Sequence, residues 1–197
     1  MNCILLAAGY GKRLRPLTLT TPKPAIKIAN KPIIRHILDH LEDMGFDDII
    51  VKLHYLPEQV IEAIGKDKYV RTNTERNLTP TAQWLKKIKK YLDEEFLVVN
   101  GDTITNLDLS DFCEFHLINK NIATVFTKHD AIHSGGTYAF DKEVLKYIKP
   151  EMNIPDLIQA LIDKNIPINI YTSDAHYFDC GTLEKLKQAK KFYEKKK

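Results

Sequence analysis

Residues 3–24 read CILLAAGYGKRLRPLTLTTPKP, and this stretch determines how the rest of the chain is interpreted. It begins with an apolar run long enough for a buried strand and then breaks at Gly9 and Gly11. Glycines let a backbone approach a ligand closely, and the cations Lys12 and Arg13 that follow favour an anionic ligand. The stretch therefore predicts a strand that ends in a polyphosphate site.

Short apolar runs alternate with amphipathic segments along the chain. The runs predict strands near residues 4–7, 25–29, 48–53, 68–72, 96–99, 123–126, 137–140, 168–171 and 177–178. Apolar residues at helical spacing predict helices near residues 32–44, 57–64, 80–92, 111–117, 142–148, 155–164 and 183–193. Thr79 and Pro80 are expected to be the N-cap and first residue of the third helix. The alternation predicts an α/β protein, a Rossmann-like three-layer sandwich with a mostly parallel mixed central sheet.

Length and composition are those of one globular domain over residues 1–197, with 44% hydrophobic and 28% charged residues. No apolar run reaches 18 residues and no signal-peptide pattern is present, so a cytoplasmic protein without membrane contact is expected. A basic helical tail at about residues 184–197 accounts for the net charge of +3, so nucleic-acid binding is not expected. Three scattered cysteines indicate reduced thiols.

Single positions in the first loop exclude two common phosphate-binding motifs. The dinucleotide fingerprint requires a third glycine at the position of Leu14. The P-loop requires a glycine at the position of Leu6 and a serine or threonine at the position of Arg13. The pattern that remains is G-x-G-x-R-L-x-P-L-T, followed by P-K-P around Lys23.

That pattern, at residues 9–18 and 22–24, resembles the first signature of the nucleotidyltransferases that make nucleotide-activated sugars from sugar 1-phosphates. Residues 99–102, 134–138 and 177–182 are similar to later motifs of the same family, in the same order. The resemblance covers nearly the whole chain. Compact mannose-1-phosphate guanylyltransferases and N-acetylmuramate-1-phosphate uridylyltransferases are the members that it resembles most.

The resemblance implies the fold of nucleotide-diphospho-sugar transferases and a Mg²⁺-dependent reaction. A nucleotidyl group would pass from a nucleoside triphosphate to a sugar 1-phosphate, which gives an NDP-sugar and pyrophosphate. Asp102 and Asp179 would be the metal ligands. Arg13 and Lys23 would be the catalytic cations, with Arg13 on the leaving pyrophosphate and Lys23 near the attacking phosphate.

The resemblance also assigns the binding positions. Nucleotide contacts are expected at Leu6, Ala7, Ala8, Gly9, Gly11, Lys12, Arg13, Glu75, Thr81, Asn100 and Gly101. Sugar-phosphate contacts are expected at Lys23, Ser134, Gly135 and Gly136. The expected partners are thus small molecules, without nucleic acid or membrane, and a homo-oligomer is left open.

Two segments depart from the family pattern, where the base and the sugar would be read. The base-reading loop at residues 75–82 lacks the family's glycine and has one extra residue. The F-x-E-K-P segment is absent between Phe126 and Ser134. Two alternatives therefore stay open: a CTP-dependent phosphocholine-type cytidylyltransferase, and a catalytically inactive regulatory or scaffold subunit of the same fold. An inactive subunit is expected to have lost Arg13, Lys23 or one of the aspartates Asp102 and Asp179, and all four are present.

Overall fold

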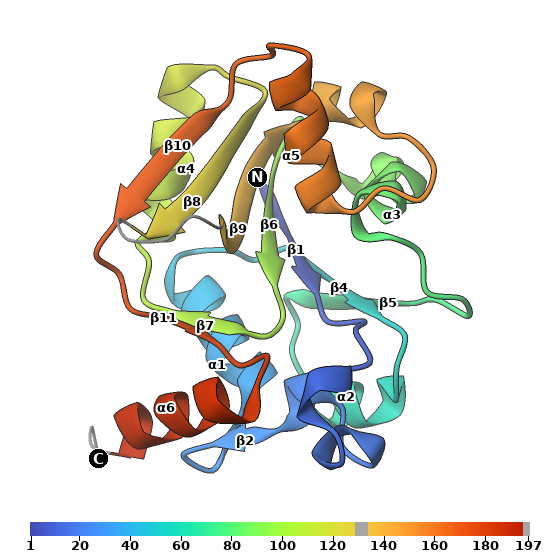
Figure 1. The fold of residues 1–197 in the computed structure, drawn as a ribbon, viewed down its shortest axis with the longest axis vertical. Coiled ribbons are helices and arrows are strands. Elements are labelled where there is room, and N and C mark those ends of the chain that lie inside the picture. The colour runs from blue at the N-terminus through green and yellow to red at the C-terminus, as the bar shows by residue number, and fades with distance from the viewer. Residues whose placement is uncertain (129–133, 195–197) are drawn as a thin grey trace.

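The computed structural model describes residues 1–128 and 134–194 (Figure 1). Its strands are β1 (Asn2–Leu6), β2 (Lys27–Ile28), β3 (Lys31–Pro32), β4 (Ile49–Leu53), β5 (Val70–Thr74), β6 (Glu95–Asn100), β7 (Thr103–Thr105), β8 (Ala123–Lys128), β9 (Ser134–Asp141), β10 (Asn169–Ser173) and β11 (Tyr177–Asp179). The α-helices are α1 (Ile33–Asp43), α2 (Pro57–Ile64), α3 (Thr81–Lys87), α4 (Leu109–Asn119), α5 (Ile154–Asp163) and α6 (Leu183–Glu194). Short 3-10 helices are η1 (Lys12–Leu14), η2 (Leu17–Leu19), η3 (Lys23–Ala25), η4 (Lys89–Tyr91) and η5 (Lys142–Tyr147). None of the helices in the described ranges is long and apolar enough to cross a membrane.

The central sheet has seven strands in the order β10-β8-β9-β6-β1-β4-β5. The pairs of β1 with β4 and β6, of β4 with β5, and of β8 with β10 are parallel. Only β9, among the described strands of this sheet, runs antiparallel to its neighbours β6 and β8. The predicted mostly parallel mixed sheet is therefore confirmed.

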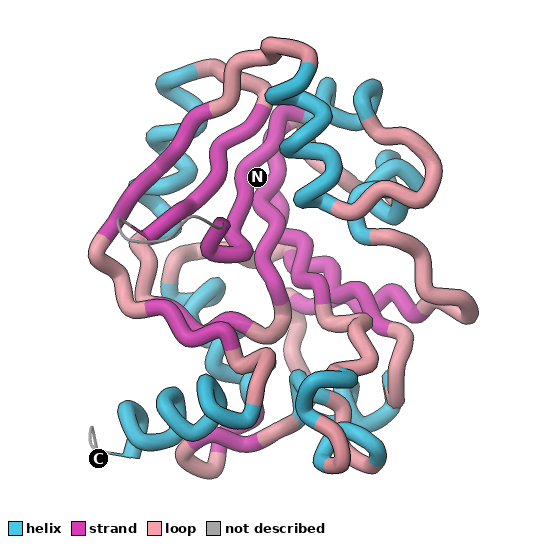
Figure 2. The backbone as a smooth tube through the Cα atoms, viewed as in Figure 1, coloured by secondary structure: helices cyan, strands magenta, loops and turns pink. Residues whose placement is uncertain are grey.

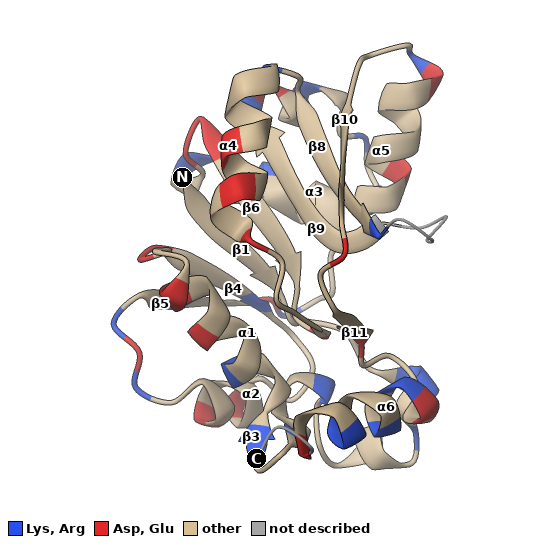
Figure 3. Ribbon diagram, turned by 90° about the vertical axis from the view of Figure 1, so that its left-hand side faces the viewer, with Lys and Arg blue, Asp and Glu red and all other residues tan. Residues whose placement is uncertain are grey.

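Helices cover both faces of this sheet, because its central strands are apolar on both faces. Within β1, Cys3 and Leu5 pack into one core with α1, α2, α4 and α6, whereas Ile4 packs into the other core with α3 and α5. The turned view shows α4 and α5 on opposite sides of the strands (Figure 3). The strands lie in the middle of the molecule with helices around them (Figure 2). The predicted three-layer sandwich is confirmed.

The start of α3 differs from the sequence prediction by one residue. Pro80 occupies the N-cap position, and Thr81 is the first helical residue. The prediction that Thr79 caps the helix is wrong because its hydroxyl donates to the carboxylate of Glu75 at 2.6 Å instead. A long-range contact thus overrides a local capping preference.

Two short elements were not predicted as they occur. β7 has three residues and exists by pairing with β11, in which Asp179 is opposite Thr103. The segment predicted as a helix at 142–148 is the 3-10 helix η5, with the Asp141 carboxylate accepting from the backbone N–H of Glu143. Such short pieces depend on tertiary pairing and leave little periodicity in a sequence.

Candidate functional site

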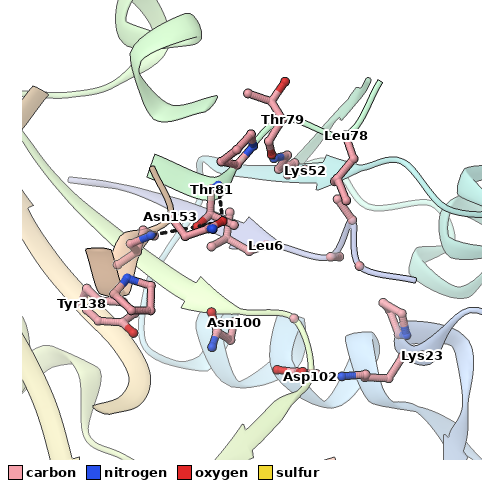
Figure 4. Close-up of a pocket in the computed structure, with 18 of the residues that line it drawn as sticks. Leu6, Lys23, Lys52, Leu78, Thr79, Thr81, Asn100, Asp102, Tyr138 and Asn153 are labelled. Carbon is pink, nitrogen blue, oxygen red and sulfur yellow. Dashed lines mark hydrogen bonds and ion pairs between the residues drawn. The ribbon is translucent and has the colours of Figure 1, made fainter. Parts of the chain in front are cut away.

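A cavity of about 490 Å³ opens where β1, β4 and β6 end, on the face of the sheet that α3 and α5 cover (Figure 4). The loops after β1 and β6 and the loops before α3 and α5 surround it. Its lining residues are Leu6, Ala7, Ala8, Gly9, Lys23, Pro24, Lys52, Leu78, Thr79, Pro80, Thr81, Asn100, Gly101, Asp102, Tyr138, Glu151, Asn153, Ile154 and Pro155. The carboxyl ends of parallel strands are where open α/β sheets bind ligands.

Three side chains on adjacent strands form a row across the cavity floor. Leu6 of β1 is in register with Asn100 of β6 on one side and with Lys52 of β4 on the other. They face α3 and α5 because side chains alternate along a strand, and Ile4 and Ile50, two residues earlier, pack into that core. The floor thus has an amide, an apolar group and a buried lysine in line.

Two glycines allow the strand ends to approach one another. A Cβ at Gly101 would lie 2.8 Å from the carbonyl oxygen of Leu6, which accepts a hydrogen bond from the Gly101 N–H at 2.9 Å. Gly136 has a φ of +70°, and a Cβ there would lie 2.5 Å from Nδ2 of Asn100. Glycine at 101 and 136 is therefore required by the close packing around Asn100.

Lys23 and Asp102 meet at the edge of the cavity. Lys23 begins η3, and Asp102 follows the end of β6, so the two residues are 79 positions apart in sequence. The Lys23 Nζ lies 2.6 Å from Oδ2 of Asp102 (Figure 4). Their side chains are 12% and 26% exposed, so this ion pair is partly shielded from water.

Asp179 is the last residue of β11, which pairs with β7 in the small sheet. Asp102 directly precedes β7. Cys180 donates its N–H to the Asp102 carbonyl at 2.8 Å, which fixes the spacing of the two backbones. The Asp179 carboxylate accepts from the Gly181 N–H at 2.8 Å and from Lys185 at 2.7 Å. Burial alone would raise the pKa of Asp179, but Lys185 and the Gly181 N–H hold it below its ordinary value.

Arg13 lies against the same loop as Asp179. A Cβ at Gly181 would be 2.6 Å from Nη2 of Arg13 and 2.6 Å from Oδ1 of Asp179. Arg13 belongs to η1, which follows Gly11 with its φ of +63°. The guanidinium and this carboxylate are therefore neighbours in the fold, although 166 positions separate them in the sequence.

The structure brings nine predicted site residues together around the cavity: Leu6, Ala7, Ala8, Gly9, Lys23, Thr81, Asn100, Gly101 and Asp102. Other predicted residues lie outside the cavity lining in the described part of the chain: Gly11, Lys12, Arg13, Glu75, Gly135, Gly136 and Asp179. Ser134 begins β9, but its side chain lies outside what the structure describes. The shortened segment before β9 falls largely on residues 129–133, which are also outside the described residues.

Sequence reasoning missed two parts of the cavity. The apolar run at residues 49–53 predicts only a buried strand, although the lysine within it, Lys52, is a signal of a polar site. The wall at residues 151–155 was missed because 50 positions separate it from Gly101. A hydrogen bond that the Thr81 N–H donates to Asn153 Oδ1 at 3.1 Å brings this wall to the cavity. Such a long-range contact has no local sequence pattern.

The donor set suits a hard cation that is completed by other ligands. Asp102 and Asp179 offer carboxylate oxygens, which Mg²⁺ prefers. The described residues hold no group of three or more His, Cys, Asp or Glu side chains placed to bind a metal by themselves. Mg²⁺ is usually held by one or two carboxylates together with water and substrate phosphates, so this pair fits it.

The comparisons with known proteins agree with this architecture. The family model described as "Nucleotidyl transferase" matches residues 2–135, more than half of the chain. The chain belongs to the nucleotidyl transferase family. The segments at residues 9–24 and 99–102 both fall within the matched range.

The curated relatives that this chain matches are longer proteins. A "Bifunctional protein GlmU" of Methanocaldococcus jannaschii is 30% identical over 88% of the chain, which spans 51% of that protein. A "Mannose-1-phosphate guanyltransferase" of Yarrowia lipolytica is 36% identical over 76% of the chain and 46% of that protein. The chain thus spans about half the length of the curated relatives that it matches.

Solved structures match the fold over almost the whole chain. A putative glucose-1-phosphate thymidylyltransferase from Bacillus anthracis superimposes with a TM-score of 0.85 at 21% identity, over 98% of this chain and 94% of that one. HddC from Yersinia pseudotuberculosis does so with a TM-score of 0.81 at 23% identity, over 98% and 99%. At these identities the similarity shows the fold alone.

Proposed function

We propose that the chain transfers a nucleotidyl group from a nucleoside triphosphate to a sugar 1-phosphate and releases pyrophosphate, with Mg²⁺ as cofactor. The contact of Lys23 with Asp102 carries the proposal: two signature segments far apart in sequence meet at 2.6 Å at the edge of the cavity. Family membership supports it, as do the names of relatives such as a mannose-1-phosphate guanyltransferase and a UTP–glucose-1-phosphate uridylyltransferase.

In this reaction a phosphate oxygen of the sugar 1-phosphate attacks the α-phosphorus of the triphosphate in line. A new P–O bond forms, the bond from the α-phosphorus to the bridging oxygen of the β-phosphate breaks, and pyrophosphate leaves with the electron pair. The step requires no protein nucleophile. The chain's contribution is therefore alignment of the two anions and neutralisation of their charge.

Lys23 and Arg13 supply the cations for this alignment. Lys23 reaches the cavity from η3, where a compact ammonium reduces the repulsion between the attacking phosphate and the α-phosphate. Arg13 lies outside the cavity lining, beside Gly181, where its guanidinium can bind the leaving pyrophosphate in a bidentate manner. Gly11 and Lys12 end the loop that leads from β1 to Arg13.

Asp102 and Asp179 are the proposed ligands of Mg²⁺. When bound, the ion supplies charge neutralisation to the phosphates that complete its coordination. Each carboxylate is paired with a lysine in the structure, Asp102 with Lys23 and Asp179 with Lys185. In these ion pairs a lysine lies beside each carboxylate and balances its charge.

The remaining predicted residues divide between the base and the sugar. We assign the backbone of residues 6–9, with Thr81, Asn100 and Gly101, to the nucleoside because all of them line the cavity. Glu75 acts on the nucleotide indirectly, since its carboxylate accepts from the N–H and the hydroxyl of Thr79. Residues 134–136 are assigned to the sugar phosphate because β9 borders β6, next to Asn100.

A pyrophosphate-release screen tests the proposal and its two alternatives. The four common nucleoside triphosphates are assayed with Mg²⁺ against a panel of sugar 1-phosphates and phosphocholine, with EDTA controls. Release that depends on a sugar 1-phosphate is the expected result. Release only with phosphocholine identifies the cytidylyltransferase alternative, and no release with any acceptor identifies an inactive subunit.

The cytoplasm remains the proposed compartment on the sequence grounds given above.

A further inference from the structure

Lys52 is a buried lysine directly beneath one wall of the cavity. Its side chain is 1% exposed, although it lies near the carboxyl end of β4 and borders the cavity. The Nζ donates to the carbonyl oxygen of Thr79 and lies 3.1 Å from Oε2 of Glu75. It also lies 5.2 Å from the ring centroid of Trp84, within range of a cation–π interaction.

Glu75 directs its carboxylate to the loop it precedes. It accepts from the Thr79 N–H at 3.2 Å and from the Thr79 hydroxyl at 2.6 Å. Lys52 approaches Oε2 from the buried side, and Lys87 approaches Oε1 at 3.6 Å from the solvent side. These contacts tie the Glu75 carboxylate to the loop that follows it.

The loop at residues 76–80 has no helix or strand of its own, yet it supplies Leu78, Thr79 and Pro80 to the cavity wall. Its shape therefore depends on side chains that hold it. An ammonium removed from water carries a desolvation penalty unless it is paired and hydrogen-bonded. The contacts of Lys52 lead to this one loop and to Trp84 of the helix that follows it.

We propose that Lys52 is a positioning residue for nucleotide selection: by fixing the Thr79 carbonyl and Glu75, it sets the wall against which the base packs. This inference rests on the proposed function and extends it, because it names the element that chooses among nucleoside triphosphates. With 1% exposure Lys52 does not touch the ligand itself. The Thr79 carbonyl is held by Lys52, and Leu78, Thr79 and Pro80 line the cavity from the same loop.

A matched pair of substitutions tests this role. Lys52→Met keeps the length of the side chain but loses the ammonium, and Lys87→Met makes the same change at the exposed lysine that contacts the same two residues. Binding of the four nucleoside triphosphates and of inorganic tripolyphosphate, which lacks a base, is measured by calorimetry. Lys52→Met is expected to weaken the preferred nucleotide at least ~10-fold and to reduce its preference over the next one, with tripolyphosphate unchanged within ~2-fold. Lys87→Met is expected to change each constant by less than ~3-fold.

Kinetics separates positioning from a general loss of structure. The KM of Lys52→Met for the triphosphate is expected to rise while kcat stays within ~3-fold, because the phosphates and their cations are untouched. If Lys52→Met does not fold, the double substitution Lys52→Met with Glu75→Leu removes both buried charges and still lacks the tie to Thr79. Either folded variant that keeps the wild-type ratio of affinities between the preferred nucleotide and the next one overturns the role of Lys52. If the wild type binds neither triphosphates nor tripolyphosphate, the proposed function fails and the role of Lys52 with it.

Discussion

Asp102 shows at the scale of one residue how far a motif predicts a site. The sequence segment 99–102 placed it just after an apolar strand, and the structure places it at the edge of the cavity with Lys23. Its neighbour Gly101 was predictable too, because close backbone approach requires a residue without Cβ. The partner of the Asp179 carboxylate was not predictable, because Lys185 reaches Asp179 only through the packing of α6.

The substitution Asp102→Asn is expected to reduce turnover at least ~100-fold, because it removes a negative charge from the proposed metal site. The fold is expected to remain, since the amide keeps the shape of the side chain. Initial rates of pyrophosphate release with excess Mg²⁺, together with far-UV circular dichroism, check both statements. Asp47→Asn is the control because Asp47 is exposed and outside the cavity lining. Near-normal turnover of Asp102→Asn would place the metal elsewhere.

Glu75 makes stability depend on pH. Burial alone would raise its pKa, but hydrogen bonds from Thr79 and Lys52 hold it below its ordinary value of 4.5. A carboxylate with a lowered pKa contributes stability above that ordinary value, and the contribution is lost as pH falls through the folded-state pKa. Lys52 and Lys87 are the charged groups that face it.

Wild-type protein is therefore expected to exceed Glu75→Gln in free energy of unfolding by about 1–3 kcal/mol near neutral pH. The difference should shrink as pH falls from 4.5 through the lower folded-state pKa of Glu75, because both side chains are uncharged below that pKa. Urea unfolding of the two proteins at a series of pH values measures it. A difference that stays constant into acid would show that Glu75 is not held ionised by Thr79 and Lys52.

At the scale of elements, the ends of α3 and α5 form one wall through mutual hydrogen bonds. The Thr81 N–H donates to Asn153 Oδ1 at 3.1 Å, and the Ile154 N–H donates to the Thr81 hydroxyl at 3.0 Å. Gln83 adds a bond from its N–H to the Met152 carbonyl at 3.1 Å. The sequence predicted both helices from their apolar spacing but not this junction, because hydrogen bonds between segments some 70 positions apart leave no periodicity.

Asn153→Ala is expected to lower the free energy of unfolding by about 1 kcal/mol, since Asn153 is the N-cap of α5. It is also expected to raise the KM for the nucleotide, because the tie to Thr81 in the cavity wall is lost. Asp108→Ala is the matched control. Asp108 caps α4 by accepting from two N–H groups at 3.0 Å and lies outside the cavity lining, so it should lose similar stability with KM unchanged. Equal KM values for both variants would show that the contact of Asn153 with Thr81 does not contribute to nucleotide binding.

At the scale of the whole molecule, one sheet carries two cores on its opposite faces. Neighbouring residues of the same strands divide between them, as Leu5 and Ile4 do in β1. Residues beyond the family match complete the cavity, with Tyr138 on β9 and the wall at 151–155. The alternation of apolar runs predicted this architecture because strand burial on both faces is visible in a sequence. It could not predict strand order, which depends on how the chain crosses between strands.

We expect residues 1–197 to unfold as a single cooperative unit, since both cores share the central strands. Leu186→Ala tests this. Leu186 of α6 is buried in the first core, and Trp84, the one tryptophan of the chain, is buried in the second. The substitution should lower the free energy of unfolding by about 2–5 kcal/mol through the cavity that it leaves.

Urea unfolding of Leu186→Ala is followed by the fluorescence of Trp84 and by far-UV circular dichroism in the same samples. A single unit requires that both signals shift to lower urea together, although Trp84 lies on the opposite face of the sheet from Leu186. Leu183→Ala, at a residue 46% exposed on the same helix, is the control and should move neither transition by more than about 0.5 kcal/mol. A Trp84 transition that stays in place while the dichroism becomes biphasic would mean that the two faces unfold separately. The cavity would then depend on only one of them.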